Sequence, residues 1–195
     1  MAMISRNQLL QDIQQQSQHR PLLIVAIDGY AGAGKSTLAA WLAEHLAQCQ
    51  IICLDDFYRP LSSEQQVLLQ AEEAVQAYLH TADVVAQILA PLREGRQAVW
   101  QALDWLSQSW LPRVPLQPQG VILLEGVFST HASFQPWLDN SVLVTADPQT
   151  RSQRVLARPQ ADTAWVAHWQ ATEDWFHHVR ATPQSVDWLV AGDSY

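Results

Sequence analysis

The stretch GYAGAGKS at residues 29–36 decides the fold of this chain. An uninterrupted apolar run at residues 22–27 comes directly before it and is typical of a strand buried on both faces. Residues 36–48 follow with leucines at positions 38, 42 and 46, the spacing of an amphipathic helix. A glycine-rich loop between a buried strand and a helix lets backbone N–H groups and the helix N-terminus surround an anion.

The stretch matches G-x-x-x-x-G-K-[ST], the P-loop motif, at every fixed position. In this motif the Lys35 ammonium reaches the β- and γ-phosphates, and the Ser36 hydroxyl binds Mg²⁺. Lys35 is the one lysine among eleven basic residues. We therefore predict ATP and Mg²⁺ as cofactors. The predicted nucleotide-binding residues here are Gly29, Ala31, Gly32, Ala33, Gly34, Lys35, Ser36 and Thr37.

Two alternatives to a P-loop are a glycine-rich turn and a dinucleotide-binding fingerprint. A glycine-rich turn could carry a lysine by chance, but the strand and helix on either side argue against that interpretation. The dinucleotide fingerprint needs a final glycine where Thr37 stands, and it contains no lysine. The P-loop interpretation is therefore preferred.

The remaining apolar runs predict an α/β domain with a parallel sheet. They lie at residues 51–54, 121–124, 142–145 and 187–190, and helical patterns separate them. With residues 22–27 they give about five strands in a three-layer P-loop NTPase fold, with helices on both faces. Residues 100–118 contain three prolines and are expected to be irregular. We expect residues 1–195 to form a single domain.

Length and charge limit the possible functions. The 195 residues are 48% hydrophobic, enough for a packed core, and carry a formal net charge of -8. So acidic a chain does not coat nucleic acid or anionic membranes, and no apolar run approaches the roughly 20 residues of a membrane span. The polar N-terminus has no signal-like apolar region, so the expected location is cytoplasmic. We expect small-molecule partners, and homo-oligomerisation stays open.

Two adjacent carboxylates, Asp55 and Asp56, follow the apolar run at residues 51–54. Open α/β folds bind ligands at the carboxyl ends of their parallel strands. A carboxylate at that edge can take the proton of a substrate hydroxyl while the oxygen attacks a γ-phosphoryl group. The alternative is a helix cap or turn without catalytic function.

Three motifs, GYAGAGKST, LDDFYRP and VILLEGVFS, together resemble the uridine kinase-like family of P-loop small-molecule kinases. This family includes uridine/cytidine kinases, nicotinamide riboside kinases and phosphoribulokinase relatives. The resemblance extends over roughly residues 22–190. It implies transfer of the ATP γ-phosphate to a hydroxyl group of a small metabolite, most simply a nucleoside or nucleoside-like compound.

The resemblance also implies roles for individual residues. Asp55 corresponds to the catalytic base, and together with Ser36 and Glu125 it lies on the Mg²⁺ side of the site. Tyr58 corresponds to an aromatic residue that shapes the acceptor pocket, and Arg59 is adjacent to it in the motif. For Glu125, the alternative is a strand-end carboxylate that caps the following loop.

Arg151, Arg154 and Arg158 recur at i, i+3 and i+7, which places them on one helix face. Such a face can close over a triphosphate and offset the charge that develops on the transferred group. The resemblance makes residues 151–162 a mobile lid, with Arg154 and Arg158 binding the nucleotide and Arg154 also catalytic. The alternative is three surface arginines paired with acids such as Asp147 and Asp162.

One segment departs from the family pattern. Ribonucleoside kinases carry Phe-Asp-His-Pro, with the aspartate on the ribose hydroxyls, where this chain has Tyr-Leu-His-Thr at residues 78–81. Leu79 cannot accept hydrogen bonds from a diol. Asp83 and Asp104 are possible substitutes, although each fits a helix cap or a loop acid better. His80 is a candidate for the acceptor pocket, and core packing explains it equally well.

The acceptor therefore stays open between a nucleoside, nicotinamide riboside and a sugar or other polyol. A function of another class is also open: an ATP-binding regulatory switch without a metabolite substrate. Against a guanine-nucleotide switch, the chain has no N-K-x-D motif, since its only lysine is in the P-loop.

Overall fold

The fold centres on a parallel six-stranded sheet with the strand order β1-β10-β9-β2-β8-β3. The computed structural model describes residues 2–58, 61, 65, 69–104, 109–158, 163–180 and 186–193. The strands are β1 (Met3–Ile4), β2 (Leu22–Asp28), β3 (Cys49–Cys53), β8 (Gly120–Glu125), β9 (Asn140–Thr145) and β10 (Trp188–Ala191). The predicted three-layer α/β fold is confirmed. The two-residue β1, which pairs with β10, adds a strand that is too short for a periodicity argument to detect.

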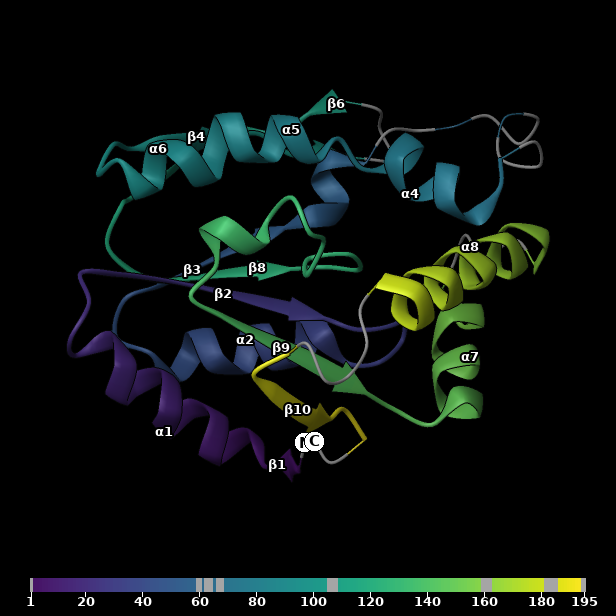
Figure 1. The fold of residues 1–195 in the computed structure, drawn as a ribbon, viewed down its shortest axis with the longest axis horizontal. Helices are drawn as coiled ribbons and strands as arrows, with labels where there is room; N and C mark the ends of the chain where they lie inside the picture. Colours follow the sequence, from purple (N-terminus) through teal and green to yellow (C-terminus); the bar gives the residue numbers. More distant parts are fainter. Residues whose placement is uncertain are drawn as a thin grey trace.

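Helices cover both faces of the sheet (Figure 1). On one face lie α1 (Arg6–Ser17) and α2 (Lys35–His45). On the other lie α4 (Ala71–Tyr78) and the continuous helical run α5 (Thr81–Val84), η2 (Val85–Leu89) and α6 (Ala90–Arg93). Helices α7 (Pro148–Leu156) and α8 (Thr163–Trp175), the latter extended by η4 (Phe176–Arg180), lie at the carboxyl ends of the strands.

Strand β2 separates two hydrophobic clusters because its side chains alternate between the two faces. Leu23, Val25 and Ile27 belong to the cluster beneath α1 and α2. Leu22 and Ile24 belong to the larger cluster beneath α4 to α6. All seven residues of β2 are buried, which explains why this strand is the longest uninterrupted apolar signal in the sequence.

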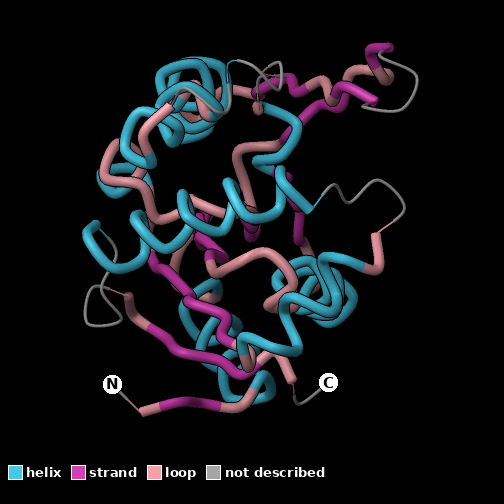
Figure 2. Tube along the Cα trace, turned by 90° about the vertical axis from the view of Figure 1, so that its right-hand side faces the viewer, coloured by secondary structure: helices cyan, strands magenta, loops and turns pink. Residues whose placement is uncertain are grey.

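The segment at residues 100–118 differs from its prediction. Instead of being irregular, it forms two antiparallel ribbons. One ribbon pairs β4 (Ala98–Trp100) with β7 (Val114–Leu116), and the other pairs β5 (Leu103–Asp104) with β6 (Ser109–Trp110). Pro115 lies inside β7, where a two-stranded ribbon leaves an open edge that tolerates a missing N–H. These ribbons stand apart from the central sheet (Figure 2).

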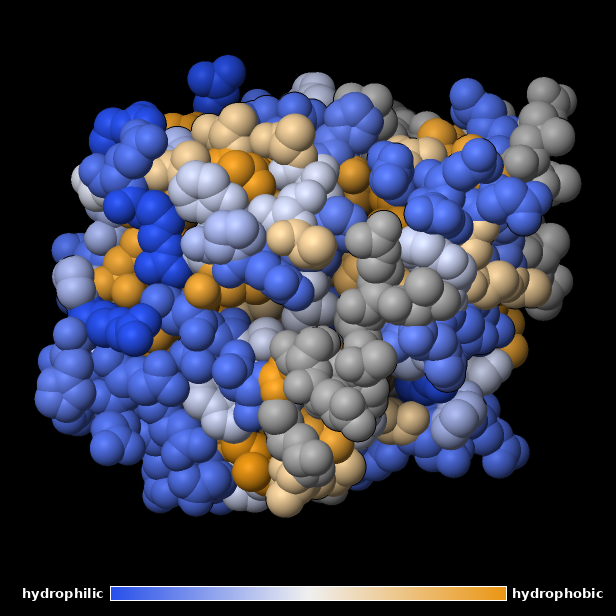
Figure 3. Space-filling view, in the orientation of Figure 1, coloured by the Kyte–Doolittle hydropathy of each residue, from blue (hydrophilic) through white to orange (hydrophobic). Residues whose placement is uncertain are grey.

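The surface is mostly polar on the face drawn in Figure 3, where hydrophilic residues predominate and apolar residues form small groups. The marks of the two chain ends overlap in the view of Figure 1 but lie well apart in the turned view of Figure 2. Among the residues that the structure describes, no helix combines the length and the apolar character needed to cross a bilayer.

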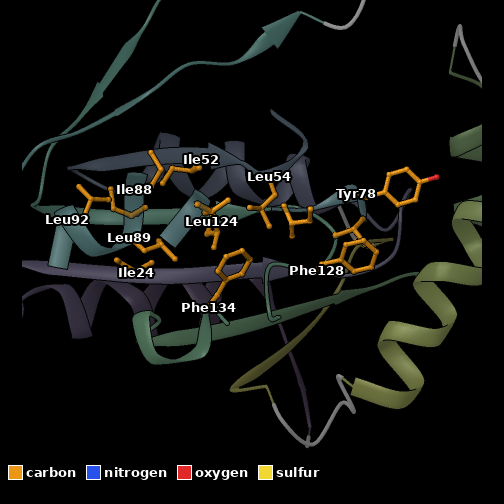
Figure 4. Packing of buried hydrophobic residues seen from close by; sticks show 14 of the residues in the cluster. Ile24, Ile52, Leu54, Tyr78, Ile88, Leu89, Leu92, Leu124, Phe128 and Phe134 are labelled. Atoms are coloured by element: carbon orange, nitrogen blue, oxygen red, sulfur yellow. The ribbon is translucent and has the colours of Figure 1, made fainter. Parts of the chain in front are cut away.

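The larger cluster predicts a specific stability effect. Phe134 is fully buried among residues such as Leu89 and Leu124 (Figure 4). We expect Phe134→Ala to lower the free energy of unfolding by about 3–5 kcal/mol, because it leaves a cavity in a packed core. Leu156→Ala changes a residue that is 47% exposed, so it should change the free energy of unfolding by less than about 0.5 kcal/mol. Denaturant unfolding of both variants checks this, and equal effects would contradict the packing described here.

Candidate active site

The P-loop leaves a ready site for an anion at the N-terminus of α2. Gly34 is the N-cap, with φ 101°, and no side chain caps the helix there. The first N–H groups of a helix have no partner within the helix, so here they are free to bind phosphate oxygens. Thr37 lies in this first turn and is exposed.

Close backbone contact with α7 requires the glycine at position 32. Gly32 has φ 76°, and a Cβ atom built on it would lie 2.5 Å from the carbonyl oxygen of Arg151. On the same edge, Arg154 donates from Nη1 to the Gly32 carbonyl oxygen over 3.0 Å. The P-loop is therefore packed directly against the helix that carries the predicted arginines.

Lys35, Ser36 and Glu125 come together beside this loop. Lys35 as a whole is 7% exposed, and its ammonium donates to the Tyr30 carbonyl oxygen over 3.1 Å. The Ser36 hydroxyl donates to Oε1 of Glu125, also over 3.1 Å. Burial raises the pKa of Glu125, and the Lys35 charge partly opposes that effect. A hydroxyl oxygen and a costly buried carboxylate are donors that fit a hard divalent cation such as Mg²⁺.

Asp55 and Asp56 lie on the 3₁₀ turn η1 (Leu54–Phe57), directly after β3. Solvent reaches Asp55, yet the surrounding protein desolvates it enough to raise its pKa, against the opposing charges of Lys35 and Arg158. Burial, with the neighbouring charges of Asp55 and Glu125, raises the pKa of Asp56 to about 6. Asp55 is therefore close enough to Lys35 for the two charges to interact, as expected for the carboxyl edge of a parallel sheet.

The buried carboxylate of Asp28, at the end of β2, was missed in the sequence. Its Oδ1 accepts from the N–H of Gly29 at 2.7 Å and of Phe128 at 3.1 Å. Its Oδ2 accepts from the N–H of Thr130 at 2.8 Å and from the Thr130 hydroxyl at 2.5 Å. Asp28 thereby ties the start of the P-loop to the loop after Glu125. The sequence did contain a signal for Asp28, because it is an acid at the end of an apolar strand, as Asp55 is.

A pocket of about 530 Å³ opens beside η1. The residues that line it are Asp56, Phe57, Tyr58, His80, Asp83, Gln87, Val99, Gln101, Trp110 and Arg113. Tyr58 forms an isolated β-bridge with Leu79, which is 2% exposed and absent from the pocket lining. Asp83 does line the pocket, with Oδ2 3.3 Å from Nδ1 of His80. A carboxylate is thus present despite the leucine at position 79.

The three arginines of the predicted lid occupy different places. Arg151 lies over the Tyr30 ring, with Cζ 3.9 Å from the ring centroid. Arg154 contacts the Gly32 carbonyl oxygen, and its Nη2 is 3.6 Å from Oδ1 of Asp193. Arg158 is exposed, and its charge lowers the pKa of Asp55. Arg158 is thus the arginine whose charge acts on the predicted base, while the other two flank the P-loop.

Some predicted positions lie outside the described residues. They are Arg59, residues 159–162 of the proposed lid, and the side chain of Asp104, whose backbone is part of β5.

Helix α8 and η4 contribute two buried titratable groups, Glu173 and His177, to which the sequence assigned no role in the site. Glu173 is 1% exposed, and burial raises its pKa to about 7. His177 is 6% exposed, its pKa is lowered by burial, and its ring lies 4.5 Å from that of Tyr30. His178 is exposed, so the two adjacent histidines point apart as helical geometry requires. Within the described ranges, no group of three His, Cys, Asp or Glu side chains could hold a metal ion.

Comparison with known proteins places the chain in a family. The model of the family described as "AAA domain" matches residues 25–165, and the chain belongs to that family. Among curated proteins, "Uridine-cytidine kinase B" of Dictyostelium discoideum is 29% identical over 143 residues, 71% of this chain and 59% of the relative. "Probable uridine-cytidine kinase" of Caenorhabditis elegans is 25% identical over 150 residues, 69% of this chain and 60% of the relative.

The chain thus spans about 60% of the length of these curated relatives. Among solved structures, "a Possible Uridine Kinase from Bacillus stearothermophilus" superposes with a TM-score of 0.64 at 19% identity. The match covers 94% of this chain and 99% of that chain. The similarity agrees with the uridine kinase-like resemblance of the motifs, and the structural match supports the P-loop kinase fold.

The raised pKa of Glu173 predicts how stability depends on pH. Between its ordinary pKa of 4.5 and about 7, the folded state keeps a proton that the unfolded state has lost. Rising pH therefore destabilises the wild type through this group, by about 3 kcal/mol once the pH exceeds 7. In Glu173→Gln the side chain does not titrate. The free energy of unfolding of the variant minus that of the wild type should rise from pH 4.5 to pH 7.

Denaturant unfolding of both proteins at pH 4.5, 5.5, 6.5 and 7.5 measures this difference. A difference that is constant over the range would contradict the buried, charge-disfavouring environment of Glu173.

Proposed function

We propose that the protein transfers the γ-phosphoryl group of ATP to a hydroxyl group of a small metabolite. One observation carries the proposal: the charge of the P-loop Lys35 acts on Asp55, and the next residue, Asp56, lines a pocket of about 530 Å³, enough for a small molecule. A phosphate cradle supports nucleotide binding. A pocket lined by Asp56 and Tyr58, next to the candidate base in sequence, supports an acceptor.

The proposed reaction is a direct displacement. The acceptor oxygen forms a bond to the γ-phosphorus while the bond to the β–γ bridging oxygen breaks and ADP leaves. Asp55 takes the hydroxyl proton as the new bond forms. The raised pKa of Asp55 suits a group that must hold a proton during the reaction.

The charges of the site favour this displacement. Lys35 lies at the P-loop, where its ammonium offsets negative charge on the phosphates. Ser36, Glu125 and Asp55 are the residues that would hold Mg²⁺, which supplies positive charge against the β- and γ-phosphates when bound. Arg154 and Arg158 belong to the proposed lid at residues 151–162, within a single catalytic domain. Arg158 is already close enough to act on the pKa of Asp55.

The acceptor proposed first is a nucleoside or nucleoside-like compound. In the pocket, the Asp83 carboxylate and His80 can bind hydroxyl groups, while Gln87 and Gln101 offer amides. The exposed Trp110 ring at the pocket supplies an apolar surface for a flat group. The two curated relatives are named "Uridine-cytidine kinase B" and "Probable uridine-cytidine kinase", which supports the same class. Nicotinamide riboside and sugars or polyols are the alternatives.

A function of another class is an ATP-dependent regulatory switch that has no acceptor. The pocket beside Asp56 and Tyr58 favours the kinase, because a switch needs no second small-molecule site next to the γ-phosphate.

Replacing the proposed base tests the chemistry. We expect Asp55→Asn to lower turnover by at least about 100-fold, because the variant cannot take the hydroxyl proton. ATP should still bind to the variant, because Lys35 and the P-loop backbone are unchanged. Asp12→Asn on α1, where Asp12 accepts a hydrogen bond from the Gln8 amide, is the matched control and should keep full turnover. Turnover of Asp55→Asn near that of the control would show that the base is assigned wrongly.

Asp83 offers a test of the pocket. We expect Asp83→Asn to raise the acceptor KM about tenfold, since a hydrogen bond to a charged group contributes about 1.5–3 kcal/mol. The KM for ATP should stay within threefold, because Asp83 lies on the acceptor side. Steady-state kinetics with the acceptor identified in a product screen measure both. An unchanged acceptor KM would remove Asp83 from the binding site.

A further inference from the structure

The buried carboxylate of Glu173 joins two parts of the site that are far apart in sequence. Its Oε1 accepts a hydrogen bond from the P-loop N–H of Ala31 over 2.7 Å. The same Oε1 accepts from the indole N–H of Trp169 over 2.9 Å. One oxygen atom on α8 therefore holds a backbone donor of the phosphate cradle and a side-chain donor one helical turn away.

Trp169 connects this oxygen to the acceptor side. Its ring is 5% exposed and packs against three aromatic rings. The centroid separations are 5.5 Å to Tyr58, 5.0 Å to Tyr78 and 5.6 Å to Phe128. Tyr58 lines the pocket, and its hydroxyl donates to the Val127 carbonyl oxygen over 2.7 Å, two residues beyond Glu125. A shift of the Trp169 ring would therefore reach both the pocket and the loop after β8.

The neighbouring groups hold the same edge of the P-loop. Arg151 stacks on the outer face of Tyr30, and Arg154 donates to the Gly32 carbonyl oxygen. The charges that act on Glu173 are those of Lys35 and Arg151, both attractive to a carboxylate. The residues on each side of Ala31 are thus contacted by arginines of α7, and Glu173 accepts the hydrogen bond from the Ala31 N–H between them. A buried carboxylate is costly unless hydrogen bonds and opposite charges offset its burial, and here two N–H donors and two cations do so.

We propose that Glu173 is a positioning residue for the phosphotransfer site, whose Oε1 fixes the P-loop through Ala31 and the acceptor wall through Trp169 in one relative arrangement. The inference rests on the proposed function, because the proposed function assigns nucleotide binding to the P-loop. Removing the acceptor oxygen leaves two buried N–H groups without a partner, so the cradle loses its shape. The effect falls on nucleotide affinity, although Glu173 contacts neither substrate.

The experiment compares a side chain that keeps the oxygen with one that lacks it. Glu173→Gln retains an Oε1 able to accept both hydrogen bonds, whereas Glu173→Met has similar length and no such acceptor. The dissociation constant of ATP with Mg²⁺ is measured on the full chain by fluorescence competition. We expect Glu173→Met to bind at least tenfold more weakly and Glu173→Gln to stay within threefold of the wild type. Glu44→Met, at an exposed glutamate of α2, is the control and should match the wild type.

The affinity measurements distinguish failure of the Glu173 inference from failure of the proposed function. Equal affinities in wild type, Glu173→Gln and Glu173→Met would overturn the inference and leave the proposed function intact. Equal loss in Glu173→Gln and Glu173→Met would also overturn it, because the charge rather than the oxygen would then matter. A wild type without measurable nucleotide affinity would overturn both proposals.

A second measurement needs no variant, in case Glu173→Met fails to fold. We expect the Ala31 amide of the ligand-free wild type to exchange with solvent deuterium at least 100-fold more slowly than in an unfolded chain, measured by NMR. An Ala31 amide that exchanges at the unfolded rate would overturn the inference, since the proposed hydrogen bond would then be absent in solution.

Discussion

The Asp28 carboxylate is the constraint on which the rest of the site depends. It is fully buried at the end of the central strand β2 and accepts four hydrogen bonds from two different loops. One loop begins the P-loop at Gly29, and the other follows Glu125 on the neighbouring strand. Phe128, with φ 72°, adopts a backbone conformation that is rare for a bulky residue, and its N–H donates to Asp28. The P-loop and the loop that follows Glu125 are thus held together by one buried group.

One cation and several buried carboxylates lie at the edge of the sheet that Asp28 organises. The charge of Lys35 acts on three carboxylates, Asp55, Glu125 and Glu173, and opposes the rise in pKa that burial causes in each. Burial outweighs that attraction in all three cases, so these carboxylates would gain from further positive charge. That imbalance is the physical reason why the site suits a divalent cation and a displaced proton.

The sequence predicted the parts whose signal is local. The P-loop, the strand-end acids Asp55 and Glu125, and the alternation of strands and helices all follow from short patterns of residues. Contacts between distant segments could not be read in this way. Glu173 looks like an ordinary helix glutamate, and only folding brings it 2.7 Å from the Ala31 N–H. The ribbons at residues 98–116 were missed because their strands have two or three residues, too few for a periodicity, and include a proline.

The central claim is that this chain moves a phosphoryl group onto a small organic acceptor. The most direct measurement incubates the purified chain with ATP labelled at the γ-phosphate, Mg²⁺ and a mixture of low-molecular-weight metabolites, and follows where the label goes. The account predicts label in an organic phosphate ester, formed only when chain, Mg²⁺ and metabolites are all present. Label that appears only as inorganic phosphate, or that stays in ATP, would contradict the account.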